Sequence, residues 1–251
     1  EELAQQMPVL KEVLDAMDVP RYELAGYEAD DLIGTISRKC EAAGWECVVV
    51  TGDKDSLQLV TDRTRVKLVS TRMGQTTTKD MTPETFREAY GFDPIHIIDL
   101  KALMGDASDN IPGVKGVGEK TAMALVQRYQ TIDALYAAMP DIEARPAMVK
   151  KLAEGEESAR MSYRLATIIT DAPLDFDPGA NLRRPVKPEL RQIFLRLEFN
   201  KLLEKMDLTE AAAPAAVEQE EREHITHVEV VETWEQAQRM LEAFRRADHV
   251  A

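Results

Sequence analysis

The sequence predicts an α/β fold: a partial parallel sheet, a helical half after it, and the start of a second α/β domain at the C-terminus. The first observation is a strand-helix-strand rhythm. A helical pattern after "YEADD" leads into the apolar stretch "ECVVVTGD", and "RVKLVS" adds a further strand. The second is that the periodicity becomes almost wholly helical after "TPETF". The third is the alternating stretch "ITHVEVV" near the C-terminus, which a helical pattern follows.

The N-terminal elements follow from apolar spacing. Pro8 lies in the first turn, or at a kink, of an amphipathic helix whose apolar residues recur at helical intervals: Leu10, Val13, Leu14 and Met17. "RYELAG" (21–26) predicts a short strand, and a second helix begins at Asp30 and Asp31. Three elements, a helix, a short strand and a second helix, therefore precede the apolar strand.

The second half begins where Thr82 caps a helix and Pro83 takes its first position. We expect helices near 83–90, 94–104, 118–129, 131–138, 145–154, 156–169 and 188–206. The predicted domain organisation is an α/β core over 1–80, a helical half over 81–208, an acidic linker over 209–224 and the beginning of another domain over 225–251.

Charge and composition limit the classes of function that the chain can have. The net charge of −14 argues, taken alone, against a nucleic-acid binder. However, the charge is uneven: the segment 209–223 is rich in glutamate and has the composition of a solvated linker, whereas 115–164 is close to neutral. No apolar run suits a membrane span or a signal peptide, and Cys40 and Cys47 form no metal motif. We expect a cytoplasmic protein without a membrane partner.

Seven carboxylates fall into three groups, two of them near predicted strand ends and the third after a predicted helix. Taken singly, each group has a plain structural explanation: helix capping for the first, a polar turn for the second and Asx caps for the third. The groups are Glu28, Asp30 and Asp31; Asp53 and Asp55; and Asp106 and Asp109.

Together the three groups predict a metal site. Ligands bind beyond the carboxyl ends of strands in α/β sheets, and Asp53 and Asp55 come directly after the clearest strand. Converging carboxylates without compensating lysines repel one another unless divalent cations neutralise them. Oxygen ligands suit Mg²⁺ or Mn²⁺, and a pair of such ions is an arrangement that hydrolyses phosphodiesters. The four histidines are scattered and offer no zinc set.

The glycine run "GVKGVGEKT" predicts a helix-hairpin-helix near 94–129. The order of Gly113, Gly116 and Gly118 does not match a dinucleotide-binding fingerprint, and no lysine directly follows the last glycine as a P-loop requires. Glycine amides allow a phosphate to approach, and Lys115 and Lys120 add charge without reading bases. The alternative is a glycine-rich turn between two core helices.

Four motifs resemble the 5′ nuclease domains of bacterial DNA polymerase I, relatives of the flap endonucleases: "YEADD", "TGDKDSLQLV", "LMGDASDNIPGVKGVGEKTA" and "LRLEFNKLL". The resemblance runs in order over about residues 1–206. It implies a PIN-like core and a divalent-metal 5′ to 3′ exonuclease and flap endonuclease that removes RNA primers and displaced 5′ strands. It further implies that the segment from Ile225 begins a 3′ to 5′ exonuclease-like domain, with a polymerase domain beyond it.

The resemblance also implies roles for single residues. All seven carboxylates become metal ligands of two or more Mg²⁺ or Mn²⁺ ions, with Asp30, Asp53 and Asp55 assigned to catalysis. The implied partners are branched or nicked duplex DNA with a 5′ flap and RNA primer–DNA, and the hairpin is also expected to hold K⁺ through backbone carbonyls. The implied DNA-binding residues are Ser108, Gly113, Lys115, Gly116, Gly118, Lys120 and Thr121.

The chain departs from the family pattern at its front. The family begins with a strand that carries a metal-binding Asp, followed by a second Asp and a basic helical arch, and none of these precedes Glu1. We therefore expect a fragment that is weak or inactive as a nuclease on its own. Two alternatives are open: a non-catalytic module that binds branched DNA, and a PIN-type ribonuclease, which does not account for the glycine hairpin.

Overall fold

The structure is a computed structural model that describes residues 2–139, 142, 145–182, 184–209 and 238. The chain divides into two compact units, Glu1–Leu190 and Arg191–Ala251, and each is treated by itself. The predicted second α/β domain, apart from Gln238, and nearly all of the predicted acidic linker lie outside the described residues. Within the described part, no helix combines the length and apolar character that crossing a membrane requires.

The sheet of the first unit has three strands, in the order β1-β2-β3: β1 (Cys47–Thr51), β2 (Thr64–Arg72) and β3 (Gln75–Met81). β1 and β2 are parallel, with Val49 opposite Val66, as the sequence predicts. β3 was not predicted and pairs antiparallel with β2, so the sheet is mixed. A tight turn joins them, in which Met73 (φ 50°) and Gly74 (φ 79°) both take the left-handed conformation that favours hairpins.

One expectation about strands is wrong. "RYELAG" (21–26) forms no strand; Tyr22 instead places its ring edge-on against Phe176 and pairs with Asn181 through its hydroxyl. Side-chain contacts rather than a backbone ladder therefore fix this segment. In β1, Val49 enters the core while Val48 and Val50 are exposed, so the strand is buried on one face only.

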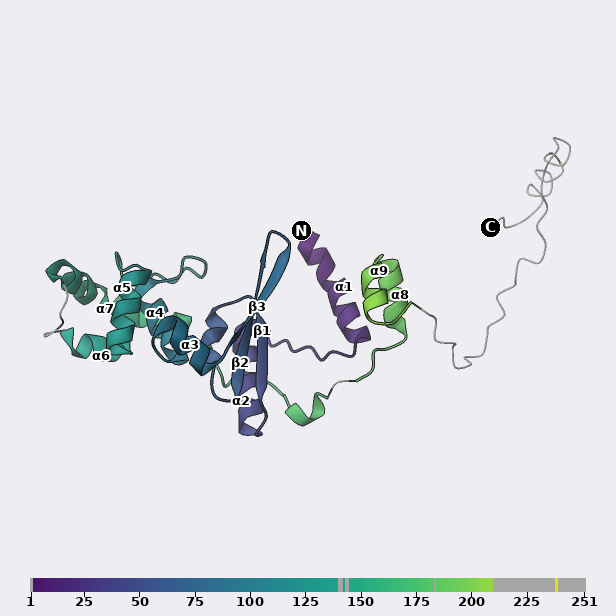
Figure 1. Cartoon of the computed structure of the whole chain (residues 1–251), viewed down its shortest axis with the longest axis horizontal. Coiled ribbons are helices and arrows are strands. Elements are labelled where there is room, and N and C mark those ends of the chain that lie inside the picture. The colour runs from purple at the N-terminus through teal and green to yellow at the C-terminus, as the bar shows by residue number, and fades with distance from the viewer. Residues whose placement is uncertain (1, 140–141, 143–144, 183, 210–237, 239–251) are drawn as a thin grey trace. The chain divides into compact units, whose positions relative to one another are not determined.

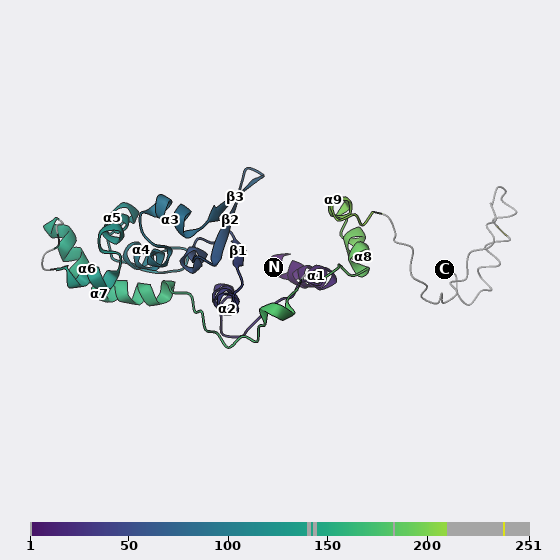
Figure 2. The same cartoon turned by 60° about the horizontal axis from the view of Figure 1, so that its bottom comes forward.

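Helices make up most of the rest of the described chain (Figures 1 and 2). Both views show α4, α5, α6 and α7 gathered beside the sheet, while α2 packs along β1. Short 3₁₀ turns lie at η1 (Asp55–Leu59), η2 (Pro94–His96) and η4 (Pro178–Ala180). The α-helices are α1 (Glu2–Ala16), α2 (Ala29–Ala42), α3 (Pro83–Tyr90), α4 (Ile97–Met104), α5 (Glu119–Tyr129), α6 (Ile132–Ala137), α7 (Pro146–Ala166), α8 (Glu189–Arg196) and α9 (Asn200–Lys205).

Two helix boundaries differ from the sequence prediction. The helices expected over 145–154 and 156–169 are one helix, α7, which runs through Gly155. A Cβ at Gly155 would lie 2.6 Å from Cγ1 of Val114, so this glycine permits close packing and does not break the helix. The single helix expected over 188–206 is two, α8 and α9, separated where Glu198 takes a positive φ of 57°.

One apolar core joins the sheet to the helices. It contains Val49 of β1 and Val66 of β2, together with Leu103 of α4, Val126 of α5 and Leu152 of α7. The core thus continues across the domain boundary predicted at 80/81. Because the same core holds both parts, the carboxyl end of β1 and the loop after α4 are fixed relative to each other.

We predict that Gly155→Ala lowers stability by about 1–3 kcal/mol, because the new methyl overlaps Val114. In an exposed helix interior the same change would instead stabilise by up to about 1 kcal/mol. Urea unfolding of both single variants and of the double variant Gly155→Ala/Val114→Ala measures this. The cost of Gly155→Ala should shrink in the Val114→Ala background, and an equal cost in both backgrounds contradicts the packing explanation.

Candidate metal centre and nucleic-acid interface

The three predicted acidic groups meet at one pocket of the first unit. The N-terminus of α2, the turn after β1 and the loop after α4 each deliver one group. Asp106 does not line the pocket, but its carboxylate lies with those of Asp55 and Asp109 within 4.8 Å of one another. The pocket has a volume of about 630 Å³, and the other six carboxylates line it: Glu28, Asp30, Asp31, Asp53, Asp55 and Asp109.

A buried lysine lies inside the acidic cluster, and the sequence analysis missed it. Lys101 of α4 is only 6% exposed. Its Nζ lies 2.7 Å from Oδ2 of Asp106 and 3.7 Å from Oδ2 of Asp109, and it also forms an ion pair with Asp55. The premise that no lysine compensates these carboxylates is therefore wrong. The available signal was a lone lysine in the apolar run "IIDLKALM", where a charge needs a buried partner.

The pKa values of this cluster diverge because its members are buried to different degrees. Hydrogen bonds from Lys101, and then from Ser108, lower the pKa of Asp106 to about 2. Burial raises the pKa of Asp55, and Lys101 offsets this only partly. Burial alone would lower the pKa of Lys101, but its bonds to Asp106 and Asp55 outweigh this and raise it. The ammonium thus substitutes for part of the positive charge that a metal ion would bring.

The two aspartates at the start of α2 differ in how many hydrogen bonds they accept within the protein. Asp31 accepts hydrogen bonds from the backbone N–H groups of Glu28 (3.2 Å) and Ile169 (2.8 Å), so it acts as a helix cap and a tether to the segment after α7. Asp30 accepts one bond, from the Asp31 N–H at 2.9 Å. Burial raises the pKa of Asp30, and the neighbouring charges of Asp31 and Asp53 add to the rise. Asp30 is thus the more available of the two as a ligand.

The donor set suits hard divalent cations. Asp55, Asp106 and Asp109 supply only carboxylate oxygens, the ligands that Mg²⁺ and Mn²⁺ prefer. Asp53 accepts a hydrogen bond from the Asp55 N–H at 2.9 Å, which fixes the turn that presents both side chains. The residues present therefore fit a divalent metal centre.

The loop between α4 and α5 is held shut at its base. Backbone hydrogen bonds join Asp106 and Ile111 in both directions, at 2.9 and 2.8 Å. A Cβ at Gly113 would lie 2.2 Å from the backbone N of Gly105, so only glycine permits this close approach. The loop therefore carries Asp106 and the glycine run as one rigid piece.

Gly113 does not present its N–H to a ligand, which corrects the sequence interpretation. It is buried and donates its N–H to Oγ of Ser162 at 2.9 Å, while its carbonyl accepts from Oγ of Ser158 at 2.6 Å. Both serines belong to α7 and were missed by the sequence analysis. Ser108 likewise donates its backbone N–H and its hydroxyl to Asp106. These two residues shape the loop and offer few free groups to DNA.

The remaining residues predicted to bind DNA lie together on the rim of the loop and the first turn of α5. Lys115 and Lys120 are exposed, and Gly118 is the N-cap of α5 with open space around it. Exposed Gly116 accepts a hydrogen bond from Nζ of Lys151 at 3.4 Å, which adds a third cation beside the loop. Thr121 stands half-buried in the first turn. Open backbone at a helix start, flanked by lysines, suits a phosphate group.

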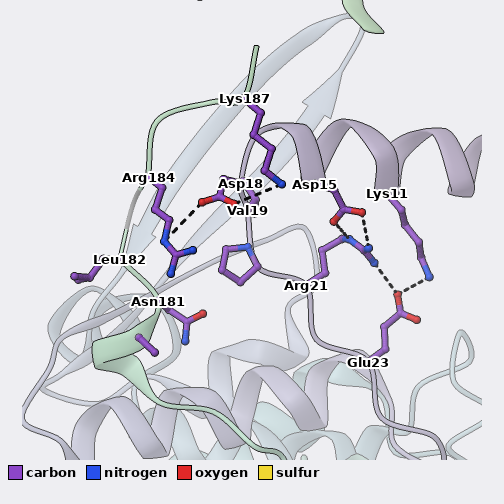
Figure 3. A pocket seen from close by; sticks show the side chains of 12 residues that line it. Lys11, Asp15, Asp18, Val19, Arg21, Glu23, Asn181, Leu182, Arg184 and Lys187 are labelled. Atoms are coloured by element: carbon purple, nitrogen blue, oxygen red, sulfur yellow. Dashed lines mark hydrogen bonds and ion pairs between the residues drawn. The ribbon is translucent and has the colours of Figure 1, made fainter. Parts of the chain in front are cut away.

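A second pocket, of about 710 Å³, shows what the acidic pocket is not (Figure 3). Its four basic and three acidic side chains pair with one another across its walls. It therefore offers neither converging carboxylates nor an unpaired cationic surface. The pairs are Lys11 with Glu23, Arg21 with Asp15 and Glu23, and Arg184 and Lys187 with Asp18.

A sheet that delivers carboxylates at its strand end, followed by a helical half with a glycine hairpin, is the arrangement expected of the 5′ nuclease class. Family models match almost all of the first unit: the N-terminal resolvase-like domain of 5′-3′ exonucleases over residues 1–91 and their C-terminal SAM fold over 92–189. The chain belongs to the 5′-3′ exonuclease family.

Its curated relatives are DNA polymerases I. The chain is 45% identical to DNA polymerase I of Bacillus subtilis (strain 168) over 213 residues, which cover 84% of this chain and 24% of that protein. It is 38% identical to the thermostable DNA polymerase I of Thermus thermophilus, with coverage of 85% and 25%. The chain thus spans about a quarter of the length of these relatives and resembles their nuclease part.

Solved structures share the fold. T5 5′-exonuclease with bound divalent metal ions (zinc) matches with a TM-score of 0.55 and 20% identity, over 81% of this chain and 70% of that chain. The catalytic core of Rad2 in complex with a DNA substrate matches with a TM-score of 0.55 and 16% identity, over 81% and 69%. At these identities the likeness shows the architecture, which agrees with the predicted PIN-like core.

We predict that Lys101→Met lowers stability by about 3 kcal/mol in EDTA at pH 7, because it leaves converging carboxylates without a cation. Adding Mg²⁺ should restore more stability to this variant than to the wild type, since the ion supplies the lost charge. Urea unfolding measures both effects. Lys67→Met is the control, because Lys67 pairs with Asp80 at the surface. Equal stabilities of Lys101→Met and wild type in EDTA contradict the compensating role.

The ion pair between Asp106 and Lys101 makes the stability of the protein depend on pH in the acid range. The pKa of Asp106 falls from 3.8 to about 2 on folding, so its bond to Lys101 stabilises the protein fully above pH 3.8 and less as the pH falls toward 2. The stability gap between wild type and Lys101→Met should therefore narrow across this window. Denaturant titrations at several pH values measure it, and a gap that stays constant below pH 3.8 contradicts the assignment.

Proposed function

We propose that the chain carries most of the 5′ to 3′ exonuclease and flap endonuclease domain of a bacterial DNA polymerase I. The single observation that carries this proposal is the convergence of seven carboxylates from three elements beside a glycine loop that suits a phosphate. The proposed reaction is divalent-metal hydrolysis of phosphodiesters in 5′ flaps and RNA primers during DNA replication and repair. The proposed ions are Mg²⁺ or Mn²⁺, two or more.

The proposed mechanism divides the carboxylates between two positions. Asp55, Asp106 and Asp109 would hold one cation, and Asp30 and Asp53, with Glu28 and Asp31 beside them, would complete the site around the pocket. Bound cations supply a more acidic attacking water and a countercharge for the leaving oxygen.

Lys101 neutralises part of the acidic cluster through its ion pairs with Asp55 and Asp106, and so holds these carboxylates together. A cation held by the same oxygens would compete with its ammonium.

The glycine loop holds the duplex away from the cut. Lys115 and Lys120 would neutralise backbone phosphates, and the open space at Gly118 would let a phosphate approach the start of α5. Gly116 and Thr121 lie beside this position, with Lys151 against Gly116. K⁺ would sit on loop carbonyls. We place the enzyme in the bacterial cytoplasm at the nucleoid, with the polymerase domain C-terminal in the same chain.

A non-catalytic module that binds branched DNA is the second candidate. One observation favours it: the ammonium of Lys101 already neutralises part of the acidic cluster, so the carboxylates do not require a metal for folding. Under this candidate the acids serve the fold and only the loop meets DNA.

Asp53→Asn and Asp106→Asn in the polymerase-length protein separate the two candidates. We predict a loss of 5′-flap cleavage of about 100-fold or more, because each change removes a metal-binding charge, while duplex affinity is spared. Cleavage of a labelled flap substrate in Mg²⁺ measures this. Asp62→Asn, an exposed carboxylate outside the pocket, is the matched control. Unchanged cleavage in both pocket variants favours the non-catalytic module.

A further inference from the structure

One arginine lies on the wall of the acidic pocket. Arg164, near the C-terminus of α7, is the sole basic side chain among the described residues that line it, opposite six carboxylates. It is exposed and, within the described part of the chain, forms no ion pair or hydrogen bond. Its planar guanidinium therefore keeps all of its donors for a ligand.

A neighbouring arginine on the same helix shows the contrast. Arg160 binds Asp133 at 2.6 Å and Glu156 at 2.9 Å, so its donors are already used. Both arginines line a smaller cavity of about 270 Å³, but Arg164 alone of the two also lines the acidic pocket. Arg164 thus lines both the acidic pocket and the smaller cavity, and its charge is not neutralised by an ion pair within the described residues.

We propose that Arg164 binds a backbone phosphate of the cleaved strand, next to the phosphodiester held at the metal centre. This rests on the proposed nuclease function. A nucleic-acid strand crossing a pocket lined with carboxylates carries one negative charge per nucleotide, and cations bound at the centre neutralise only the phosphate that they touch. The adjacent phosphate needs another partner, and a guanidinium can hold its oxygens in a bidentate manner.

The surface around Arg164 suits a nucleotide. Leu165 and Ile169 line the same pocket and are 59% and 43% exposed. They place apolar surface beside the guanidinium, against which a sugar or an unstacked base can pack. Arg164 therefore positions the strand for cleavage and is not itself placed at the reacting atoms.

The test compares Arg164→Gln with Arg160→Gln, which removes the same charge one turn earlier on the same helix. Binding of a fluorescent 5′-flap DNA to this chain is measured by anisotropy in Ca²⁺ over a range of salt, with a gel to check that the DNA stays intact. Arg164→Gln should weaken Kd about 3- to 10-fold and reduce the salt slope by about one. Arg160→Gln should change neither, and Arg164→Lys should recover the slope but only part of the affinity. The thermal melting temperatures of Arg164→Gln and the wild type should match, because the guanidinium of Arg164 forms, with the residues that the structure describes, no ion pair or hydrogen bond that the change would remove.

The proposal is overturned if Arg164→Gln binds like the wild type, or if both glutamine variants weaken binding equally. A wild-type chain that does not bind the flap DNA contradicts the proposed function itself, and with it the role of Arg164. Cleavage by the Asp53→Asn variant distinguishes a failure of the Arg164 contact from a failure of the nuclease function. If that variant loses cleavage while Arg164→Gln binds normally, the nuclease function stands and only the phosphate contact fails.

Discussion

Repulsion among carboxylates is the constraint on which the first unit depends. Six acidic side chains line one pocket, and a seventh lies against two of them. Bringing such groups together is unfavourable unless positive charge accompanies them. In this structure the ammonium of Lys101 supplies that charge at Asp55, Asp106 and Asp109. A lysine beside the pocket thus offsets part of the charge of a carboxylate set that suits divalent cations.

The fold converts this local balance into a fixed geometry. A continuous core joins the sheet to the helical half, so the end of β1 and the loop after α4 cannot drift apart. Gly105 and Gly113 pack closely enough to close the base of the loop, and Ser158 and Ser162 of α7 fix Gly113 from the other side. The segment that holds Asp106 against Asp55 and Asp109 thus also carries the exposed lysines and glycines suited to a phosphate.

Sequence patterns predicted what is local and missed what depends on distant contacts. α3 was predicted from the cap at Thr82 and the proline at Pro83, and the position of Asp53 and Asp55 followed from the end of β1. α7 was predicted as two helices, over 145–154 and 156–169, because no local pattern shows that Gly155 packs against Val114, which lies 41 positions earlier in the chain. β3 was missed because its residues are polar and mostly exposed. The role of Lys101 was invisible because no spacing rule links a lysine in α4 to the end of β1.

Crystals of the chain grown with Mn²⁺ test the central claim most directly, since anomalous scattering locates this ion without reference to activity. The account predicts at least one Mn²⁺ at coordination distance, roughly 2.0–2.6 Å, from carboxylate oxygens of Asp55, Asp106 and Asp109. It also predicts that the ammonium of Lys101 moves away from Asp55. An acidic pocket without Mn²⁺ at millimolar concentration, with the ion pairs of Lys101 unchanged, would contradict the claim that these residues form a metal centre.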